Sequence, residues 1–249
     1  MKKFSNTYIF IYSAILVAVV AVLLSLVATS LKDKQQSNVT NEKMQSLLKA
    51  INVEVERDAA PKAYEQYFTE EMTVTTAGAV ENVFSVSAGK QTQGSVRPFD
   101  VNLKEEQKTE RQKAGTGRFP IYRFDKDGKS GIVLPLRGTG LWGAVWGYIA
   151  LADDCSTVKG ITFDHEGETP GLGAEIANHD KFQTPFIGKQ ILDEQGRVVS
   201  IAVKKHAHKE GLHEVDALSG GTMTSNGVNN MLATDLKRYQ KFFDQYRNK

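Results

Sequence analysis

The chain has 249 residues, of which 41% are hydrophobic and 24% are charged, and its formal net charge is +2. These proportions are typical of a folded protein, and a charge so close to zero gives no electrostatic reason to expect nucleic-acid binding. The single cysteine, Cys155, excludes an internal disulfide and a metal or iron–sulfur site built from cysteine alone.

An uncharged apolar segment occupies residues 9–31. A helix of this length can cross a hydrocarbon core of about 30 Å, and it exceeds the about 7–15 apolar residues of a cleaved signal peptide. We therefore expect one uncleaved transmembrane anchor, preceded by a tail at 1–8 and followed by a polar tether at 32–43. Lysines flank the anchor on both sides, so charge alone does not fix its orientation.

Residues 44–249 predict one soluble α+β domain, with a largely antiparallel sheet and flanking helices. Its first half combines helical spacing, small β-branched residues and a charged segment at 100–114 that we interpret as a solvated face or loop. From residue 119 onward, apolar runs cut by glycine turns predict strands. Helices are predicted at 44–51, 63–72, 173–182 and 226–246, and strands within 73–89, 119–138, 144–152, 157–165 and 197–205.

The segment DALSGGTMTSNGV, residues 216–228, combines hydroxyls and glycines directly before the last predicted helix. Ser225 or Thr224 is placed to cap that helix with its side-chain oxygen. Glycines before a helix N-terminus also suit an anion, which the helix dipole favours. The loop matches neither Walker A nor the dinucleotide fingerprint. The residues alone therefore leave two interpretations, a phosphate near Thr222 or a capped helix after a glycine turn.

Two further glycine-rich segments precede this one. In RGTGLWGAVWGY, residues 137–148, Trp142 and Trp146 lie among four glycines, which suits a flat ring system, although Trp in a strand is also typical of a core. In DHEGETPGLGAE, residues 164–175, a tight turn precedes Gly173, which lets another group come close. A plain polar loop is the alternative for the second segment.

The three segments, in this order, resemble the FMN-binding domain family. DALSGGT is similar to its flavinylation motif, which usually reads Asp, two residues, Ser or Thr, Gly, Ala, Thr, and Gly221 takes the place of the usual alanine. RGTGLWG and GETPGLG resemble the other two signature loops. With one N-terminal anchor, the chain is similar to the C subunit of Na+-translocating NADH:quinone oxidoreductases. The G subunit of Rnf-type ferredoxin:NAD+ oxidoreductases, with the same domain and anchor, is the alternative.

The resemblance implies FMN attached through its phosphate to the hydroxyl of Thr222 as a phosphoester, installed by a flavin transferase that recognises Asp216. It also implies an electron relay without a catalytic acid, base or nucleophile, since the redox chemistry belongs to the flavin. The phosphate would be lined by Ser219, Gly220, Gly221 and Thr224. The isoalloxazine or the ribityl chain would lie near Leu141, Trp142, Glu168, Thr169, Leu172 and Gly173.

The implied partners are the other subunits of the membrane complex, A, B, D, E and F, notably B, D and E. Single electrons would pass from an iron–sulfur centre of the membrane subunits through this flavin to a second covalent flavin on the B subunit. Ubiquinone would be the final acceptor, and Na+ would cross the membrane. The domain would lie on the periplasmic side of a bacterial inner membrane.

Two other classes of function stay open. His206, His208 and His213, followed by Glu214, allow an anchored metal-binding protein, because two histidines separated by one residue of extended chain point the same way. A solvated basic loop explains the same residues. An anchored scaffold that only holds partners is the other possibility, with its glycine loops serving as turns.

Overall fold

The computed structural model describes residues 5–247, and the chain divides into two compact units, residues 1–43 and 44–249. The first helix, α1 (Asn6–Ala50), contains a stretch long and apolar enough to cross a membrane. Residues 32–43 continue this helix, and residues 44–50 are its last turns. The prediction of a separate short helix at 44–51 is therefore wrong, because the polar segment before it contains no glycine or proline to end α1.

The second unit is built on one antiparallel sheet with the strand order β3-β2-β1-β4-β5-β6-β7. This arrangement confirms the expected antiparallel α+β fold, and the strands predicted at 144–152 and 157–165 are present and pair with each other. Two short strands, β8 (Ala202–Lys204) and β9 (Glu214–Asp216), form a separate parallel pair. The strand predicted at 197–205 is therefore shorter in the structure, where only β8 falls in that range. The strands of the large sheet are β1 (Phe68–Val74), β2 (Val80–Ser85), β3 (Lys90–Gln93), β4 (Phe119–Lys126), β5 (Lys129–Thr139), β6 (Ala144–Ala152) and β7 (Val158–His165).

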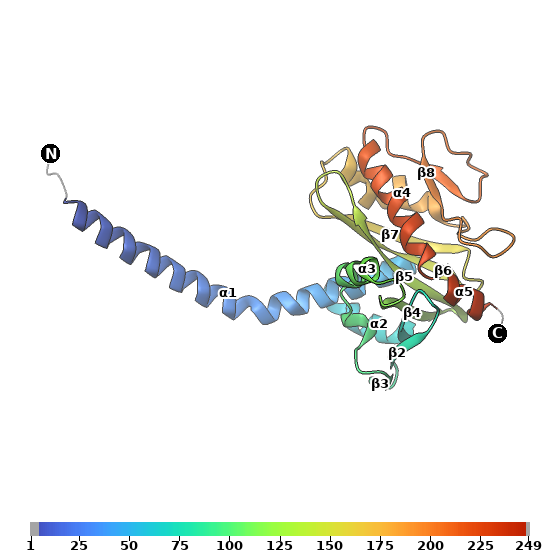
Figure 1. The fold of residues 1–249 in the computed structure, drawn as a ribbon, viewed down its shortest axis with the longest axis horizontal. Coiled ribbons are helices and arrows are strands. Elements are labelled where there is room, and N and C mark those ends of the chain that lie inside the picture. The colour runs from blue at the N-terminus through green and yellow to red at the C-terminus, as the bar shows by residue number, and fades with distance from the viewer. Residues whose placement is uncertain (1–4, 248–249) are drawn as a thin grey trace. The chain divides into compact units, whose positions relative to one another are not determined.

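Two hydrophobic clusters cover the two faces of this sheet. Successive side chains of β5 point to opposite faces of the sheet, so Ile132 and Leu134 belong to one cluster and Val133 to the other. The first cluster is closed by α4 (Thr222–Lys237), which packs against β5, and by α5 (Gln240–Tyr246) (Figure 1). The second is closed by the last turns of α1 and by α2 (Ala60–Tyr67).

The helix predicted at 63–72 is wrong in its second half, because α2 ends at Tyr67 and β1 follows at once. Glu71 is fully buried in β1, where its carboxylate accepts hydrogen bonds from the Arg97 guanidinium at 2.6 and 3.0 Å. Arg97 comes 26 residues later in the chain. Because the partner is so distant in sequence, a local pattern could not show that this charged position faces inward.

Three other predicted elements differ from the structure. The charged segment at 100–114 contains a helix, α3 (Leu103–Gln112), whose first turn is capped by the Asn102 side chain accepting from the Lys104 N–H at 3.1 Å. The helix predicted at 173–182 is a 3-10 turn (Gly173–Ala177) followed by a π turn (His179–Gln183). The last predicted helix begins earlier, at Thr222, and is divided into α4 and α5.

Candidate functional site

The three glycine-rich loops meet around the buried carboxylate of Glu168. The hydroxyl of Thr224, in the first turn of α4, donates to Oε2 of Glu168 at 2.5 Å. The backbone N–H of Trp142, in the loop between β5 and β6, donates to Oε1 at 2.9 Å. Glu168 itself lies in the loop after β7. One side chain thus connects three segments that are far apart in the sequence.

Glycines allow the loops to come this close. A Cβ atom on Gly140 would lie 2.5 Å from Oε1 of Glu168, and a Cβ on Gly173 would lie 2.5 Å from Oε2 of the same carboxylate. A Cβ on Gly227 would overlap the backbone oxygen of Thr139. Each of these contacts lies well inside van der Waals distance, so the absence of a side chain at these positions is a condition of the site.

Glu168 is ionised at neutral pH. Burial opposes the charged form, but the hydrogen bonds from Thr224 and from the backbone N–H groups of residues 141–143 outweigh it and lower the pKa of Glu168 below its usual value. The carboxylate therefore acts as a fixed acceptor that orients both loops. It also holds the Thr224 hydroxyl inside the site, where that residue is buried and out of reach from solvent.

Thr222 differs from Thr224 in being exposed, and it is the first residue of α4. Gly221 occupies the N-cap position without a side-chain hydrogen bond, after Gly220 with φ of 77°. The N–H groups of the first helical turn therefore lie beside the Thr222 hydroxyl without helical partners.

The prediction that Ser225 or Thr224 caps the helix is wrong. The helix begins three residues before Ser225, and the Ser225 hydroxyl instead accepts from the Leu218 N–H at 3.0 Å. This bond ties the first turn of α4 back to the preceding loop.

Large apolar side chains are exposed on the same three loops. Leu141 is 50% exposed and Trp142 69%, and Leu172 and Met223 are 44% and 59% exposed. Leu172 lies against the loop before α4, since a Cβ on Gly220 would be 2.8 Å from its Cδ2 atom. Thr169 stabilises the turn that carries Leu172, its carbonyl oxygen accepting from Leu172 N–H at 3.1 Å. Apolar groups left exposed around a polar site suit a flat, partly apolar ligand.

Asp216 is exposed at the end of β9, and Ser219 and Gly220 are exposed beside it. Its Oδ1 atom accepts from the Ala207 N–H at 2.9 Å, so Asp216 also holds the basic loop that follows β8. The usual alanine would fit at Gly221, because a Cβ there would lie 3.1 Å from the Leu218 Cβ and require a shift of only a few tenths of an ångström.

The histidines do not form a metal site in the described part of the chain. Within residues 5–247, no group of three or more His, Cys, Asp or Glu side chains is placed to hold a metal ion. His206 and His208 are exposed, while His213 forms a hydrogen bond of 2.7 Å between its Nδ1 atom and the Gln190 carbonyl oxygen.

The antiparallel sheet, with glycine loops converging beside an exposed threonine at a helix start, is the arrangement expected for a domain of the FMN-binding class. Residues 140–237 match the FMN-binding domain family. This range includes the second and third motifs in full and the first motif from Gly140 onward. The chain is 30% identical over 212 residues to the C subunit of the Na(+)-translocating NADH-quinone reductase of Vibrio vulnificus, with 84% of this chain and 82% of that protein covered. It is 46% identical over 109 residues to the same protein of Neisseria meningitidis, with 43% and 42% covered.

Solved structures agree with these sequence relationships. The crystal structure of the C subunit of the Na(+)-translocating NADH-quinone reductase from Parabacteroides distasonis has a TM-score of 0.72 and 34% identity, covering 86% of this chain and 96% of that one. Shewanella oneidensis NqrC shares the fold, with a TM-score of 0.67 at 23% identity, covering 84% and 99%. The chain belongs to the family of C subunits of the Na+-translocating NADH-quinone reductases, as the motifs and the N-terminal apolar segment together predicted.

Proposed function

We propose that this chain carries FMN esterified through its phosphate to the hydroxyl of Thr222, and that it relays single electrons within a Na+-translocating NADH:quinone oxidoreductase. The difference between two neighbouring threonines carries the proposal. Thr222 is exposed at the helix start, whereas Thr224 is 2% exposed and its hydroxyl is bonded to Glu168. A modifying enzyme can reach only the first.

The start of α4 suits a phosphodiester at Thr222. One negative charge remains on such a group, and a helix N-terminus stabilises it by about 0.3–1 kcal/mol. Gly220, with φ of 77°, and Gly221 add no side chain of their own to the backbone before the helix. Ser219 adds an exposed hydroxyl on the same turn.

The apolar part of the flavin would lie over the exposed side chains of Leu141, Trp142 and Leu172. FMN supplies the redox chemistry when bound, and the protein supplies position, exclusion of water and a fixed electrostatic surrounding. Glu168 is held ionised between Thr224 and Trp142 and fixes the loops relative to one another. It has no proton to exchange at neutral pH.

Family membership supports the following place for this chain in the complex. Electrons would come from an iron–sulfur centre of the membrane subunits and pass to a second covalent flavin on the B subunit, with ubiquinone as final acceptor, among partners A, B, D, E and F. Residues 9–31 would form the single membrane anchor, after a tail at 1–8 and before a tether at 32–43. The domain at 44–249 would face the periplasm.

Mass measurement of the flavinylated protein tests the attachment. The chain is produced with a matching flavin transferase, denatured, and examined by intact mass and in-gel fluorescence. We expect an increment of FMN minus water that Thr222→Ala abolishes, while Thr224→Ala keeps the label. A label that persists in Thr222→Ala and maps to Thr224 would show that the attachment site is wrong.

A further inference from the structure

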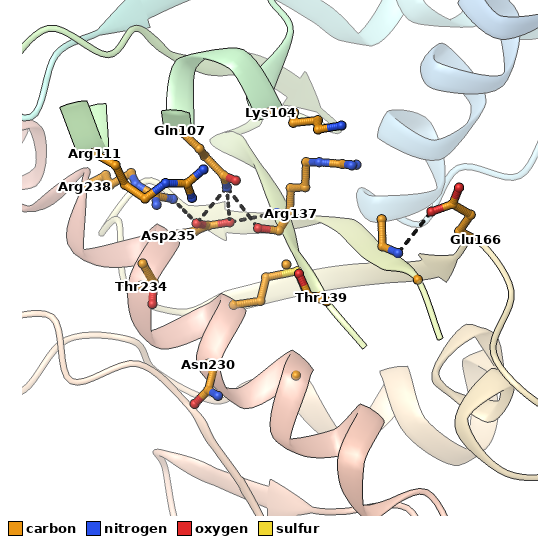
Figure 2. Close-up of a pocket in the computed structure, with 15 residues that line it drawn as sticks. Lys104, Gln107, Arg111, Arg137, Thr139, Glu166, Asn230, Thr234, Asp235 and Arg238 are labelled. Carbon is orange, nitrogen blue, oxygen red and sulfur yellow. Dashed lines mark hydrogen bonds and ion pairs between the residues drawn. The ribbon is translucent and has the colours of Figure 1, made fainter. Parts of the chain in front are cut away.

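A polar pocket of about 630 Å³ lies beside the loops of the candidate flavin site. It is lined by α3, by the end of β5 and by the middle of α4, and Figure 2 shows its side chains. Four basic residues contribute to it, Lys104, Arg111, Arg137 and Arg238. The charged segment of α3 and the first residue of the RGTGLWG motif thus meet at one place, although they lie in different parts of the sequence.

Three of these cations have no carboxylate partner. Among residues 5–247, no Asp or Glu lies within ion-pair distance of the Lys104, Arg111 or Arg137 side chains. Of the four, Arg238 is paired, with Asp235. Figure 2 shows the Lys104 and Arg137 side chains extending in the same direction, from α3 and from β5. Like charges that share a pocket without a counter-ion create a site for an anionic group.

Asp235 does not pair with the Lys104, Arg111 or Arg137 side chains, because its oxygens are bonded to other groups within the fold. They accept from the Arg137 backbone N–H at 2.7 Å, from Gln107 Nε2 at 3.1 Å and from the Arg238 guanidinium. Burial is the main cause that lowers the pKa of Arg238, and of the nearby charges Arg111 lowers it while Glu110 raises it. Four basic and two acidic residues, Asp235 and Glu166, line the pocket, so it carries two net positive charges.

The pocket reaches the flavin loops. Thr139 ends β5, Gly143 belongs to the loop that carries Trp142, and Glu166 precedes Glu168 in the second loop. Gly227, which lies about one and a half turns after Thr222 in α4, also lines the pocket. A group bound in the pocket would therefore stand next to the candidate site of electron transfer.

We propose that this pocket is the docking site for a carboxylate-bearing segment of another protein of the complex. The chain belongs to a family of subunits, so a protein surface is available to it. Electron-transfer encounters use small interfaces and depend on charge complementarity for speed and orientation. Acidic side chains that pair with Lys104, Arg111 and Arg137 would bring the partner's redox centre to the flavin loops.

The composition of the pocket favours a protein segment over a lone anion. Its volume is many times the about 30 Å³ share of one water molecule, so a single phosphate would leave most of it empty. Its wall also includes the exposed amide of Asn230, which suits the polar contacts of a polypeptide. This inference adds a docking surface to the proposed electron relay, and it does not require that the flavin be attached at Thr222.

Zero-length crosslinking of the purified complex tests the docking directly. A carbodiimide joins a lysine amine to a carboxylate in contact with it and leaves arginine unreacted. We expect mass spectrometry to identify an amide between Lys104 and an Asp or Glu of a neighbouring protein in the complex, and Lys104→Arg to remove it. Lys108 is the control, because it lies on the same helix, outside the pocket, 3.9 Å from Glu105. Lys108→Arg should remove only the crosslink to Glu105.

Charge-reversal variants test whether the basic residues of the pocket contribute to association with the other subunits. The double variant Lys104→Glu, Arg137→Glu should slow salt-sensitive association with the remaining subunits about tenfold at low ionic strength, whereas Lys108→Glu should not. Flavin fluorescence in gels is measured on the same samples, so a variant that is loaded but docks poorly separates this inference from the proposed function. Thermal melting confirms that the variants fold.

Three results would overturn the proposal. One is a Lys108–Glu105 crosslink without any intersubunit adduct of Lys104. Another is unchanged association of the charge-reversed variant at all salt concentrations. The third is binding of the isolated full chain to inorganic phosphate or to phosphatidylglycerol vesicles that depends on Lys104 and Arg137, with no adduct to a neighbouring protein.

Discussion

The hydroxyl of Thr224 donates a hydrogen bond of 2.5 Å to the carboxylate of Glu168, a residue 56 positions earlier in the chain. Together with the bond from Trp142 N–H, this contact holds the three glycine loops at one site. It also distinguishes the two threonines of the motif, because it uses the hydroxyl of Thr224 and leaves that of Thr222 exposed. The arrangement of the loops therefore depends on one buried carboxylate.

Glu168→Gln should destabilise the domain by about 1–3 kcal/mol, because an amide offers one oxygen where two donors now point at two oxygens. The free energy of unfolding from urea titrations measures the effect. Glu166→Gln is the control, since Glu166 is exposed and accepts only one backbone hydrogen bond, at 3.2 Å from Ala144. An equal effect of both substitutions would contradict a central role for Glu168.

Acid should weaken the domain through the same residue. The folded-state pKa of Glu168 is lowered, so the unfolded chain takes up this proton at higher pH than the folded chain does. Its contribution is fully present above the unfolded pKa of about 4.3 and is lost as pH falls toward the folded pKa. Urea titrations between pH 7 and acid should show a shallower loss of stability in Glu168→Gln than in the wild type. Parallel pH curves would contradict this.

Gly173→Ala should disrupt the site, since its Cβ would lie 2.5 Å from a Glu168 oxygen and would overlap the Thr224 hydroxyl. We expect a loss of about 1–3 kcal/mol of stability from overpacking, together with reduced flavin loading. Gly167→Ala, in the same loop, is the matched control, because a Cβ there meets no atom within 4 Å. Loading is read by in-gel fluorescence and stability by urea titration. Normal flavin loading of Gly173→Ala would show that the site does not require the close contact of Gly173 with Glu168 and Thr224.

Gly221→Ala restores the residue that the family motif usually has, and it should leave flavin loading and stability within about 0.5 kcal/mol of the wild type. The backbone at Gly221, with φ of −105°, accepts an L-residue. Gly220→Ala should behave differently, because its φ of 77° and a contact of 2.8 Å to Leu172 are both unfavourable. We expect a cost of about 1–2 kcal/mol for that substitution. Similar results for the two variants would contradict the backbone geometry of this loop.

Asp216→Ala should reduce flavin loading while the domain stays folded. In the proposed function Asp216 would offer a negative charge to the transferase, and in the structure its Oδ1 atom accepts from the Ala207 N–H. Asp216→Asn removes the charge and keeps an acceptor oxygen. If recognition depends on the charge, both variants load poorly, and if Asp216 acts by holding the loop, Asp216→Asn loads normally. The rate of flavin incorporation by the transferase distinguishes these outcomes.

Local sequence determined those features that depend on neighbouring residues. The apolar run at 9–31 indicates a long apolar helix, the glycine motifs locate the three loops, and the spacing of apolar residues predicts the paired strands β6 and β7. The order of the motifs was enough to identify the family, since each is short and continuous in the chain.

Tertiary structure alone decided the features that depend on distant partners. Glu71 is buried in a strand, where the distant Arg97 pairs with it, and Thr224 is buried, with its hydroxyl bonded to the distant Glu168. Lys104 looks like part of a solvated charged segment until α3 brings it into one pocket with Arg137. The physical reason is common to all three, since burial and hydrogen bonding depend on distance in space, and the partners lie tens of residues away in the chain.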